Sequence, residues 1–527
     1  MIDAACAAVS ESALMAHAAE FARYVKLSGT PGERASLDYV RSCLDGFGYR
    51  TELLLHDAYI SLPGPARIEL GGSTLDAITH SFSRAADGLS APLLDVGEGA
   101  AIGPEAAGRI LLVEGIASPA VAARASAMGA LGQIHISPRE HRHEMCISPV
   151  WGSPSASTLP GLPTTTVCTL SHAAGMALRA RLAQGESLEP ALYAEVDTGW
   201  RPTPILVADL DGPADAPFIL LSGHHDTWYY GVMDNGAANA TMLEAARLAA
   251  GHRTAWRRGL RLCFWSGHSH GRYSGSAWYA DHHWAELDRS CAAHVNVDST
   301  GGIGATVLTD SATASELASL ARAAVAAETG QLHAGHRSSR SSDASFWGVG
   351  IPSMFGSIST QPPSPVKMRN ALGWWWHTPE DLLDKLDPAF LARDTRVVLR
   401  ALLHLLTDPV LPLDYAAHAA ALLAVLEPLG PIAAPLAGAA RALQAAAAGP
   451  HSDHALMQAS RALVPLDYTT GDRFTHDPAL PQPPWPTLDP LRTHATHPTP
   501  HTEIDALRAR NRALHALQTA EAALRAA

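Results

Sequence analysis

A histidine and two aspartates lie close together at the end of a short apolar run. Residues 218–221 predict a buried strand, His224 and Asp226 follow it directly, and Asp234 comes one loop later. Imidazole and carboxylate groups are the ligand set of hydrolytic zinc sites. A helical pattern begins at about Asn239, so these groups lie between a strand end and the next helix. Open α/β sheets place their ligand sites at that point.

Three further loops carry groups of the same chemistry. The run 260–265 is followed by His268, Ser269 and His270, the run 293–298 ends in Asp298, and Trp374–Trp376 precede His377. The carboxyl ends of parallel strands meet at one edge of a doubly wound sheet, so we expect these side chains to converge. A single histidine among 27 is weak evidence, and His225, His268 and His294 are the weakest members. Their joint placement at strand ends makes the set improbable by chance.

The rest of the chain predicts the scaffold that would position these groups. Residues 1–63 and 201–408 alternate strands and helices, which predicts an α/β domain with a mostly parallel sheet flanked by helices. Residues 64–200 predict a compact inserted domain of strands with one or two helices, and its loop 139–144 is dense in polar side chains. Residues 409–527 predict Ala-rich helices, an extended Pro/His-rich segment at about 474–501 and a final helix. That segment is either an arm that wraps a partner subunit or a solvated linker.

The predicted elements follow from hydrophobic periodicity. The expected strands are 51–62 (stopped by Pro63-Gly64), 109–115, 129–136, 205–210, 218–221, 260–265, 293–298 and 351–355. The expected helices include 118–128, 240–250, 276–287, 314–329 and 388–406.

Composition narrows the class of protein. The chain has 527 residues and a net charge of −13 without a basic run, which argues against a nucleic-acid partner. Its six cysteines are scattered, as in proteins with reduced thiols. The N-terminus has no basic n-region, and the apolar run 416–448 is broken by charged residues, Pro and Gly, so we expect no signal peptide and no membrane span. The expectation is a soluble cytoplasmic protein.

The motifs resemble those of the co-catalytic zinc aminopeptidases, and specifically the branch of glutamate carboxypeptidase II and the transferrin receptor. The resembling residues are His224–Trp228, Gly231, Asp234–Ala237, Leu243–Arg247, Gly275–Ser276, Asn296–Ser299, Asp343–Phe346, Gly350–Pro352 and His377–Thr378. The resemblance implies an aminopeptidase-like fold, a protease-associated apical domain at 64–200 and a dimerisation-like helical domain at 409–527. It therefore also implies a homodimer.

The resemblance further implies roles for the candidate residues. His224 and Asp298 would bind one metal ion, Asp234 would bridge two, and His377 would bind the second. Asp226 would accept the other ring N–H of His224 and fix its tautomer. Two divalent ions, with zinc as the expected metal, would lie about 3.5–4 Å apart, activate a water molecule and polarise a carbonyl group.

One loop departs from the family pattern. The family has two adjacent glutamates at the positions of Ser269 and His270, and this chain has no glutamate between Glu244 and Glu286. His270 can still bind a metal ion as a neutral imidazole. Ser269 cannot replace a glutamate general base, because a hydroxyl has no useful pKa near neutrality.

Three alternatives follow from this departure. His268 takes the proton, or the apical loop supplies His143 or Glu144, or the protein does not hydrolyse peptides.

Aromatic residues near the motifs suggest a pocket for a flat or apolar group. The candidates are Trp228, Tyr230 and Trp376, with core packing as the alternative for Trp228. No arginine cluster for a glutamate carboxylate can be assigned. The function expected is a dinuclear metal-dependent hydrolase of an amide or peptide-type C–N bond in a small or short peptide-like substrate. The alternative is a catalytically degenerate binding or scaffold protein of the transferrin-receptor kind.

Overall fold

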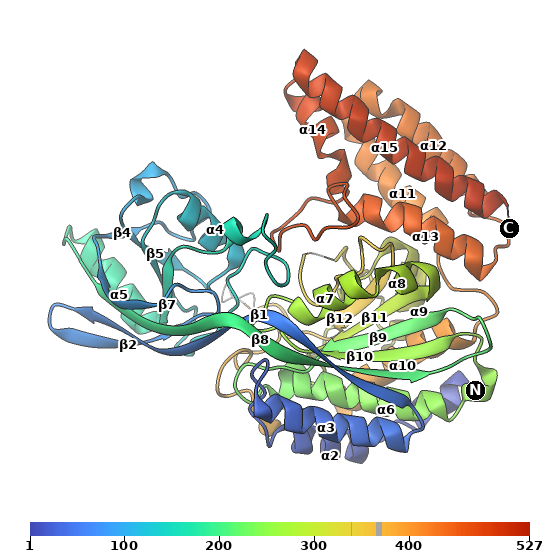
Figure 1. Cartoon of the computed structure of the whole chain (residues 1–527), viewed down its shortest axis with the longest axis horizontal. Helices are drawn as coiled ribbons and strands as arrows, with labels where there is room; N and C mark the ends of the chain where they lie inside the picture. Colours follow the sequence, from blue (N-terminus) through green and yellow to red (C-terminus); the bar gives the residue numbers. More distant parts are fainter. Residues whose placement is uncertain (339, 365–370, 527) are drawn as a thin grey trace.

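A single mixed sheet runs through the chain in the computed structural model, which describes residues 1–338, 340–364 and 371–526 (Figure 1). The strand order is β12-β11-β9-β10-β8-β1-β2-β7-β6-β5-β4, and β3 pairs with β8. One half of this sheet carries the predicted site, and the other half forms the inserted apical region.

The site half is built on four parallel strands. They are β9 (Phe218–His224), β10 (Gly259–Trp265), β11 (Cys291–Asp298) and β12 (Ser353–Ser357). Their residues are almost all buried because helices cover both faces, which explains why they are continuous apolar runs in the sequence. The prediction of a mostly parallel α/β sheet flanked by helices is confirmed.

Two layers of helices cover this half of the sheet. Figure 1 shows α2 (Glu11–Phe21), α3 (Pro31–Gly46) and α6 (Ala238–Ala250) on one side and α7 (Ser274–His282) and α8 (Trp284–Ser290) on the other. Helix α10 (Pro388–Thr407) packs on α6, and α1 (Ile2–Ala7) and α9 (Ala318–Thr329) pack on α10. The main core lies between the sheet and helices α2, α3, α6 and α10. A smaller apolar cluster lies between the sheet and helices α7 and α8.

Strands β1 (Arg50–Leu70) and β8 (Ala191–Leu210) are much longer than predicted. The expected stop at Pro63-Gly64 is wrong: β1 continues through it with only a register irregularity between Pro63 and Ala66. Proline lacks an N–H but is tolerated at such irregularities. The two strands therefore form a continuous antiparallel ribbon that joins the site half to the apical region.

The elements of the apical region include the predicted strands 109–115 and 129–136 and the predicted helix 118–128. The elements are β2 (Ser73–Thr79), β3 (Ala86–Ser90), β4 (Leu93–Asp95), β5 (Ile110–Glu114), α4 (Pro119–Ala127), β6 (Gly132–Ile136), β7 (Thr166–Leu170) and α5 (His172–Ala183). A separate apolar cluster fills its interior.

A buried histidine in this region predicts acid sensitivity. His80 is fully buried, its Nδ1 accepts a hydrogen bond from the Met145 N–H at 3.1 Å, and burial lowers its pKa to about 3. The unfolded chain binds a proton at this histidine below about pH 6.5 and the folded chain does not. Stability should therefore fall as pH decreases, by up to about 1.4 kcal/mol per pH unit from this residue.

The check is thermal unfolding of the wild type and of His80→Gln at about pH 7 and about pH 5. We expect a smaller decrease in Tm for His80→Gln, because glutamine does not titrate. The exposed His454→Gln is the control and should keep the wild-type decrease. Equal decreases in the wild type and His80→Gln would contradict the prediction.

The C-terminal helices form a bundle apart from the sheet (Figure 1). They are α11 (Tyr415–Leu426), α12 (Ala434–Ala446), α13 (Asp453–Tyr468), α14 (Asp489–Thr496) and α15 (Pro500–Arg525). The prediction of an extended segment at 474–501 is wrong in part, since α14 lies within it. The segment before α14 also binds the core: Arg473 donates to the carbonyl of Val349, and the Ala479 N–H donates to the carbonyl of Pro149.

One stretch of the described residues, Tyr415–Ala446, is long and apolar enough by composition to cross a membrane. In the structure it consists of α11 and α12, joined by a 3-10 turn in which Gly430 has φ of 70°. The two helices pack against each other. Each is only about 18–20 Å long at 1.5 Å per residue, shorter than a hydrocarbon core of about 30 Å. This geometry favours a folded hairpin over a span.

Candidate metal centre

Four segments bring the predicted ligands to the carboxyl edge of the parallel strands. His224 ends β9, Asp298 ends β11, and Asp234 lies in the irregular turn Val232–Ala237 before α6. His270 follows β10, and His377 arrives from the loop after β12. These five residues therefore lie in one region, as the meeting of parallel strand ends at one edge of the sheet predicts.

Asp234 lies between two histidines. Its Oδ1 is 3.1 Å from His224 Nε2, and its Oδ2 is 3.1 Å from His377 Nε2. Asp298 Oδ1 lies 3.7 Å from the same His224 nitrogen. The two carboxylate oxygens of Asp234 therefore face different histidines, which is the arrangement of a bridging ligand.

Asp381 holds Asp234 in this position. Its two carboxylate oxygens accept hydrogen bonds from the backbone N–H groups of Met233 at 2.9 Å and Asp234 at 3.0 Å. Sequence reasoning assigned no role to Asp381, although it lies close to His377 in the chain. Its contribution depends on a contact between segments that are distant in sequence, and no local pattern predicts such a contact.

His270 has one occupied and one unoccupied ring nitrogen. Its Nδ1 is 3.0 Å from the hydroxyl of Ser28, whereas its Nε2 is buried and has no hydrogen-bond partner. The ring of Trp228 packs on His270 at 4.3 Å and on His377 at 5.5 Å. Trp228 is only 3% exposed, which favours the packing role over a substrate-binding one.

Asp226 acts differently from the implied role. The Nδ1–H of His224 donates to the backbone carbonyl of Asp226 at 2.8 Å, while the nearest carboxylate oxygen of Asp226 is 3.9 Å away. The expectation that the Asp226 carboxylate fixes the His224 tautomer is therefore corrected. The carboxylate instead accepts from the N–H groups of His268 at 3.2 Å and Ser269 at 2.9 Å, and so shapes the divergent loop.

His268 is oriented by a carboxylate that sequence reasoning had not assigned. Its Nδ1 is 2.7 Å from Asp343 Oδ2, and Ser276 donates to the other oxygen of Asp343 at 2.8 Å. The His268 ring stacks on His224 with centroids 3.7 Å apart and an interplanar angle of 13°. Ligand atoms of His224, His268 and Asp298 all lie within 4.8 Å of one another. Asp343 belongs to the resembling motif, so the signal for it was present in the sequence.

Ser269 and the remaining aromatic candidates have distinct surroundings. Ser269 is 2% exposed, and its hydroxyl has no hydrogen-bond partner among the described residues. Trp376 stacks on His377 at 3.5 Å. Tyr230 is 41% exposed, and its carbonyl accepts a hydrogen bond from Lys26. Of these two aromatic candidates, Trp376 contacts a candidate ligand and Tyr230 is open to solvent.

The apical loop contacts the His377 loop through backbone groups. The His377 Nδ1–H donates to the carbonyl of Glu144 at 2.7 Å, and the Glu144 N–H donates to the carbonyl of His377 at 3.0 Å. His143 Nδ1 likewise donates to the carbonyl of Trp376 at 2.6 Å. Burial raises the pKa of Glu144 to about 8, and its carboxyl contacts Tyr229. The apical region therefore fixes the orientation of His377.

The carboxylates of Asp234 and Asp298 stay ionised at neutral pH. Burial opposes the ionisation of Asp234, but the adjacent imidazoles of His224 and His377 hold its pKa well below the ordinary value. Burial likewise opposes the ionisation of Asp298, and the contact with His224 lowers its pKa. The cluster thus concentrates negative charge where imidazole lone pairs also point.

A metal ion fits this arrangement because three of the predicted ligand atoms lack other partners. His224 Nε2, Asp234 Oδ1 and His270 Nε2 are all buried without a hydrogen bond among the described residues. Unpaired buried polar atoms are costly, and bound ions are one established way to satisfy them. These atoms are also the ones predicted to bind metal.

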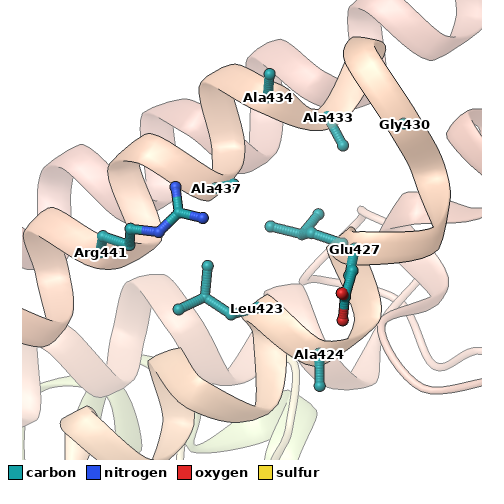
Figure 2. Close-up of a pocket in the computed structure, with 9 residues that line it drawn as sticks. Leu423, Ala424, Glu427, Gly430, Ala433, Ala434, Ala437 and Arg441 are labelled. Atoms are coloured by element: carbon teal, nitrogen blue, oxygen red, sulfur yellow. The ribbon is translucent and has the colours of Figure 1, made fainter.

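A surface cavity lies away from this centre. Figure 2 shows a pocket of about 360 Å³ between α11 and α12 in the C-terminal bundle. Its lining is mostly Leu and Ala, with Glu427 and Arg441 as the charged residues. This pocket has no cluster of metal-ligating side chains among the described residues, so the candidate centre remains at the sheet edge.

Comparisons with known proteins agree with this geometry. Residues 206–402 match the model of Peptidase family M28. A probable glutamate carboxypeptidase VP8 of Zea mays is 32% identical over 91 residues, a stretch that spans 16% of this chain and 13% of the relative.

Solved structures share the fold. The aminopeptidase from Aneurinibacillus sp. strain AM-1 is 18% identical, with a TM-score of 0.59 over 78% of this chain and 98% of that one. The Peptidase M28 precursor from Shewanella amazonensis SB2B is 19% identical, with a TM-score of 0.61 over 76% of this chain and 95% of that one. The resemblance inferred from the sequence is confirmed: residues 206–402, which carry the ligand cluster, match Peptidase family M28, and the chain shares the fold of the solved aminopeptidases.

Proposed function

We propose that the chain is a dinuclear metal-dependent hydrolase that cleaves an amide or peptide-type C–N bond in a small substrate. The observation that carries the proposal is the position of Asp234, with one carboxylate oxygen toward His224 and the other toward His377. An M28 peptidase domain surrounds it.

The chain offers ligands for two divalent ions. His224 and Asp298 would hold the first, His270 and His377 the second, and Asp234 both. Zinc is the metal we propose, since imidazole and carboxylate suit it. Two such ions supply activation of a water molecule and polarisation of the scissile carbonyl.

We assign the general-base role to His268 and a positioning role to Asp343. The hydrogen bond from His268 Nδ1 to Asp343 fixes the tautomer whose Nε2 can accept a proton. A base whose orientation is fixed by a further group is the arrangement expected of a catalytic pair. This pair would take over the role of the absent family glutamate, while the buried Ser269 hydroxyl has no partner that could activate it.

Substrate size follows from the surroundings of the centre. The apical loop lies against the His377 loop through hydrogen bonds from His143 and Glu144, and it covers that side of the site. Trp376 and Tyr230 would contact an apolar or flat substrate group. We therefore propose a small or short peptide-like substrate. A homodimer through the C-terminal bundle and a cytoplasmic location complete the proposal.

Metal content tests the function directly. We expect close to two zinc ions per chain after dialysis against zinc and then metal-free buffer, and amide-hydrolysing activity that a chelator abolishes and zinc restores. His224→Ala should lose the first ion and the activity, whereas His454→Ala, on the exposed surface, should keep both. Inductively coupled plasma mass spectrometry and turnover of an amide library are the measurements.

A different result would favour the alternative function. A correctly folded wild-type chain without stoichiometric metal, and without metal-dependent turnover, would contradict a hydrolase. It would support the alternative, a binding or scaffold protein. That alternative arises because this chain has neither of the two adjacent glutamates of the family pattern.

A further inference from the structure

Ser28 lies in a short segment that is held firmly against the metal centre. The segment connects α2 to α3, and Ser28 is fully buried. The ammonium group of Lys26 donates to the carbonyl of Tyr230 at 2.8 Å, and the Thr227 N–H donates to the carbonyl of Lys26 at 2.8 Å. These bonds fix the Ser28 hydroxyl beside the 268–270 loop.

The Asp226 carboxylate determines where the hydroxyl proton of Ser28 points. It accepts hydrogen bonds from the backbone N–H groups of His268 and Ser269, which can only donate. The Ser28 Oγ lies 2.6 Å from Asp226 Oδ2 and must therefore donate its single proton to that oxygen. The lone pairs of the hydroxyl remain available to accept.

The hydroxyl oxygen of Ser28 can still accept a hydrogen bond, and this favours one tautomer of His270. His270 Nδ1 lies 3.0 Å from Ser28 Oγ, so it carries the proton and donates it. The Ser28 N–H also approaches Nδ1, but at the longer distance of 3.4 Å. If Nδ1 accepted from that N–H, the proton would be on Nε2, which has no acceptor among the described residues. The first tautomer gives up the longer contact with the Ser28 N–H, but it keeps the shorter one and avoids two lone pairs facing each other across 3.0 Å. It also leaves the Nε2 lone pair free.

We propose that Ser28 is a positioning residue that sets the tautomer of His270 and so makes His270 a ligand for the second metal ion. This inference rests on the proposed function. The resembled family has a carboxylate at this position, which needs no tautomer because both oxygens accept. A histidine there requires a partner for Nδ1, and the chain supplies it as a relay from the Asp226 carboxylate through the Ser28 hydroxyl. Such outer contacts typically change metal affinity by about 10- to 100-fold.

The test measures zinc binding, not turnover. Isothermal titration with zinc chloride in a competing chelator buffer would resolve the affinities of the two sites. For Ser28→Ala we expect an affinity about 10- to 100-fold lower at the second site and unchanged at the first. Ser28→Thr keeps the hydroxyl and should remain within about threefold of the wild type. Unfolding of the zinc-free proteins checks that the variants fold.

A second pair of variants separates tautomer control from general support. In a His270→Glu background the ligand is a carboxylate, so adding Ser28→Ala should change the affinity of the second site by less than about threefold. An equal loss in both backgrounds would show that Ser28 only supports the loop and would overturn the inference. So would an unchanged second site in Ser28→Ala. A wild type that binds no zinc would instead overturn the proposed function itself.

Discussion

Asp234→Asn is expected to lose both metal ions and to lower turnover by at least about 10³-fold, which corresponds to about 4 kcal/mol of transition-state free energy. The two oxygens of Asp234 face different histidines, each at 3.1 Å. Asparagine keeps the shape, but it replaces one oxygen with an NH₂ group that cannot bind a cation, and it removes the negative charge that both sites share. Asp234 is the ligand that both proposed sites share.

His377→Ala is the matched comparison. It should remove the second ion and keep the first, because the ligands proposed for the first ion are His224, Asp298 and Asp234. Metal analysis gives the stoichiometry, and thermal unfolding gives an independent measure, since ligand at about 100 times its Kd stabilises by about 2.7 kcal/mol. Zinc should raise the Tm of the wild type, raise that of His377→Ala less, and leave that of Asp234→Asn unchanged. Two ions retained in Asp234→Asn would rule out the bridging role.

The positions of the candidate ligands were predictable because they depend on strand ends. Parallel strands with both faces covered are continuous apolar runs, so the sequence locates where β9 and β11 end. His224 and Asp298 follow from that alone. His377 follows from the motif, since its loop has no strand immediately before it.

The contacts that orient those ligands were not predictable in the same way. The partner of His224 Nδ1 is the carbonyl of Asp226, and a backbone carbonyl is present at every residue. Ser28 and Asp381 lie far in sequence from the residues that they contact. Serine and aspartate are also common in loops and at helix starts. Only the packing of α2, α3 and the last loop against the sheet edge brings them to the site.

Two errors in the fold predicted from the sequence have a related cause. The continuation of β1 past Pro63 depends on its long pairing with β8, which overrides the local preference for a turn. The segment after α13 is rich in proline and polar residues, but Arg473 and the backbone of Ala479 find partners in two other regions. In both cases, contacts between distant segments determine the structure. Such contacts produce no periodic pattern in the local sequence.

His268→Ala is expected to lower turnover by about 10²- to 10⁴-fold, the usual contribution of a general base, while both zinc ions remain bound. Asp343→Asn should have a smaller effect in the same direction, because it removes the charge behind His268 but keeps a polar group at 2.7 Å. Ser269→Ala is the matched control from the same loop and should change turnover by less than about threefold, since its hydroxyl has no partner to activate it. Initial rates and metal content are measured on the same preparations.

The metal content decides between two roles that the geometry of His268 allows. Its ligand atom lies close enough to those of His224 and Asp298 to share an ion with them, and its ring is parallel to that of His224. A ligand would take the first ion with it when replaced by alanine, whereas a base would leave the stoichiometry at two. Loss of the first ion in His268→Ala would therefore replace the base assignment with a third ligand for that ion. Equally small effects of His268→Ala and Ser269→Ala, with both ions present, would transfer the role to the apical loop, whose Glu144 contacts His377 through its backbone carbonyl and carries a carboxyl with a raised pKa.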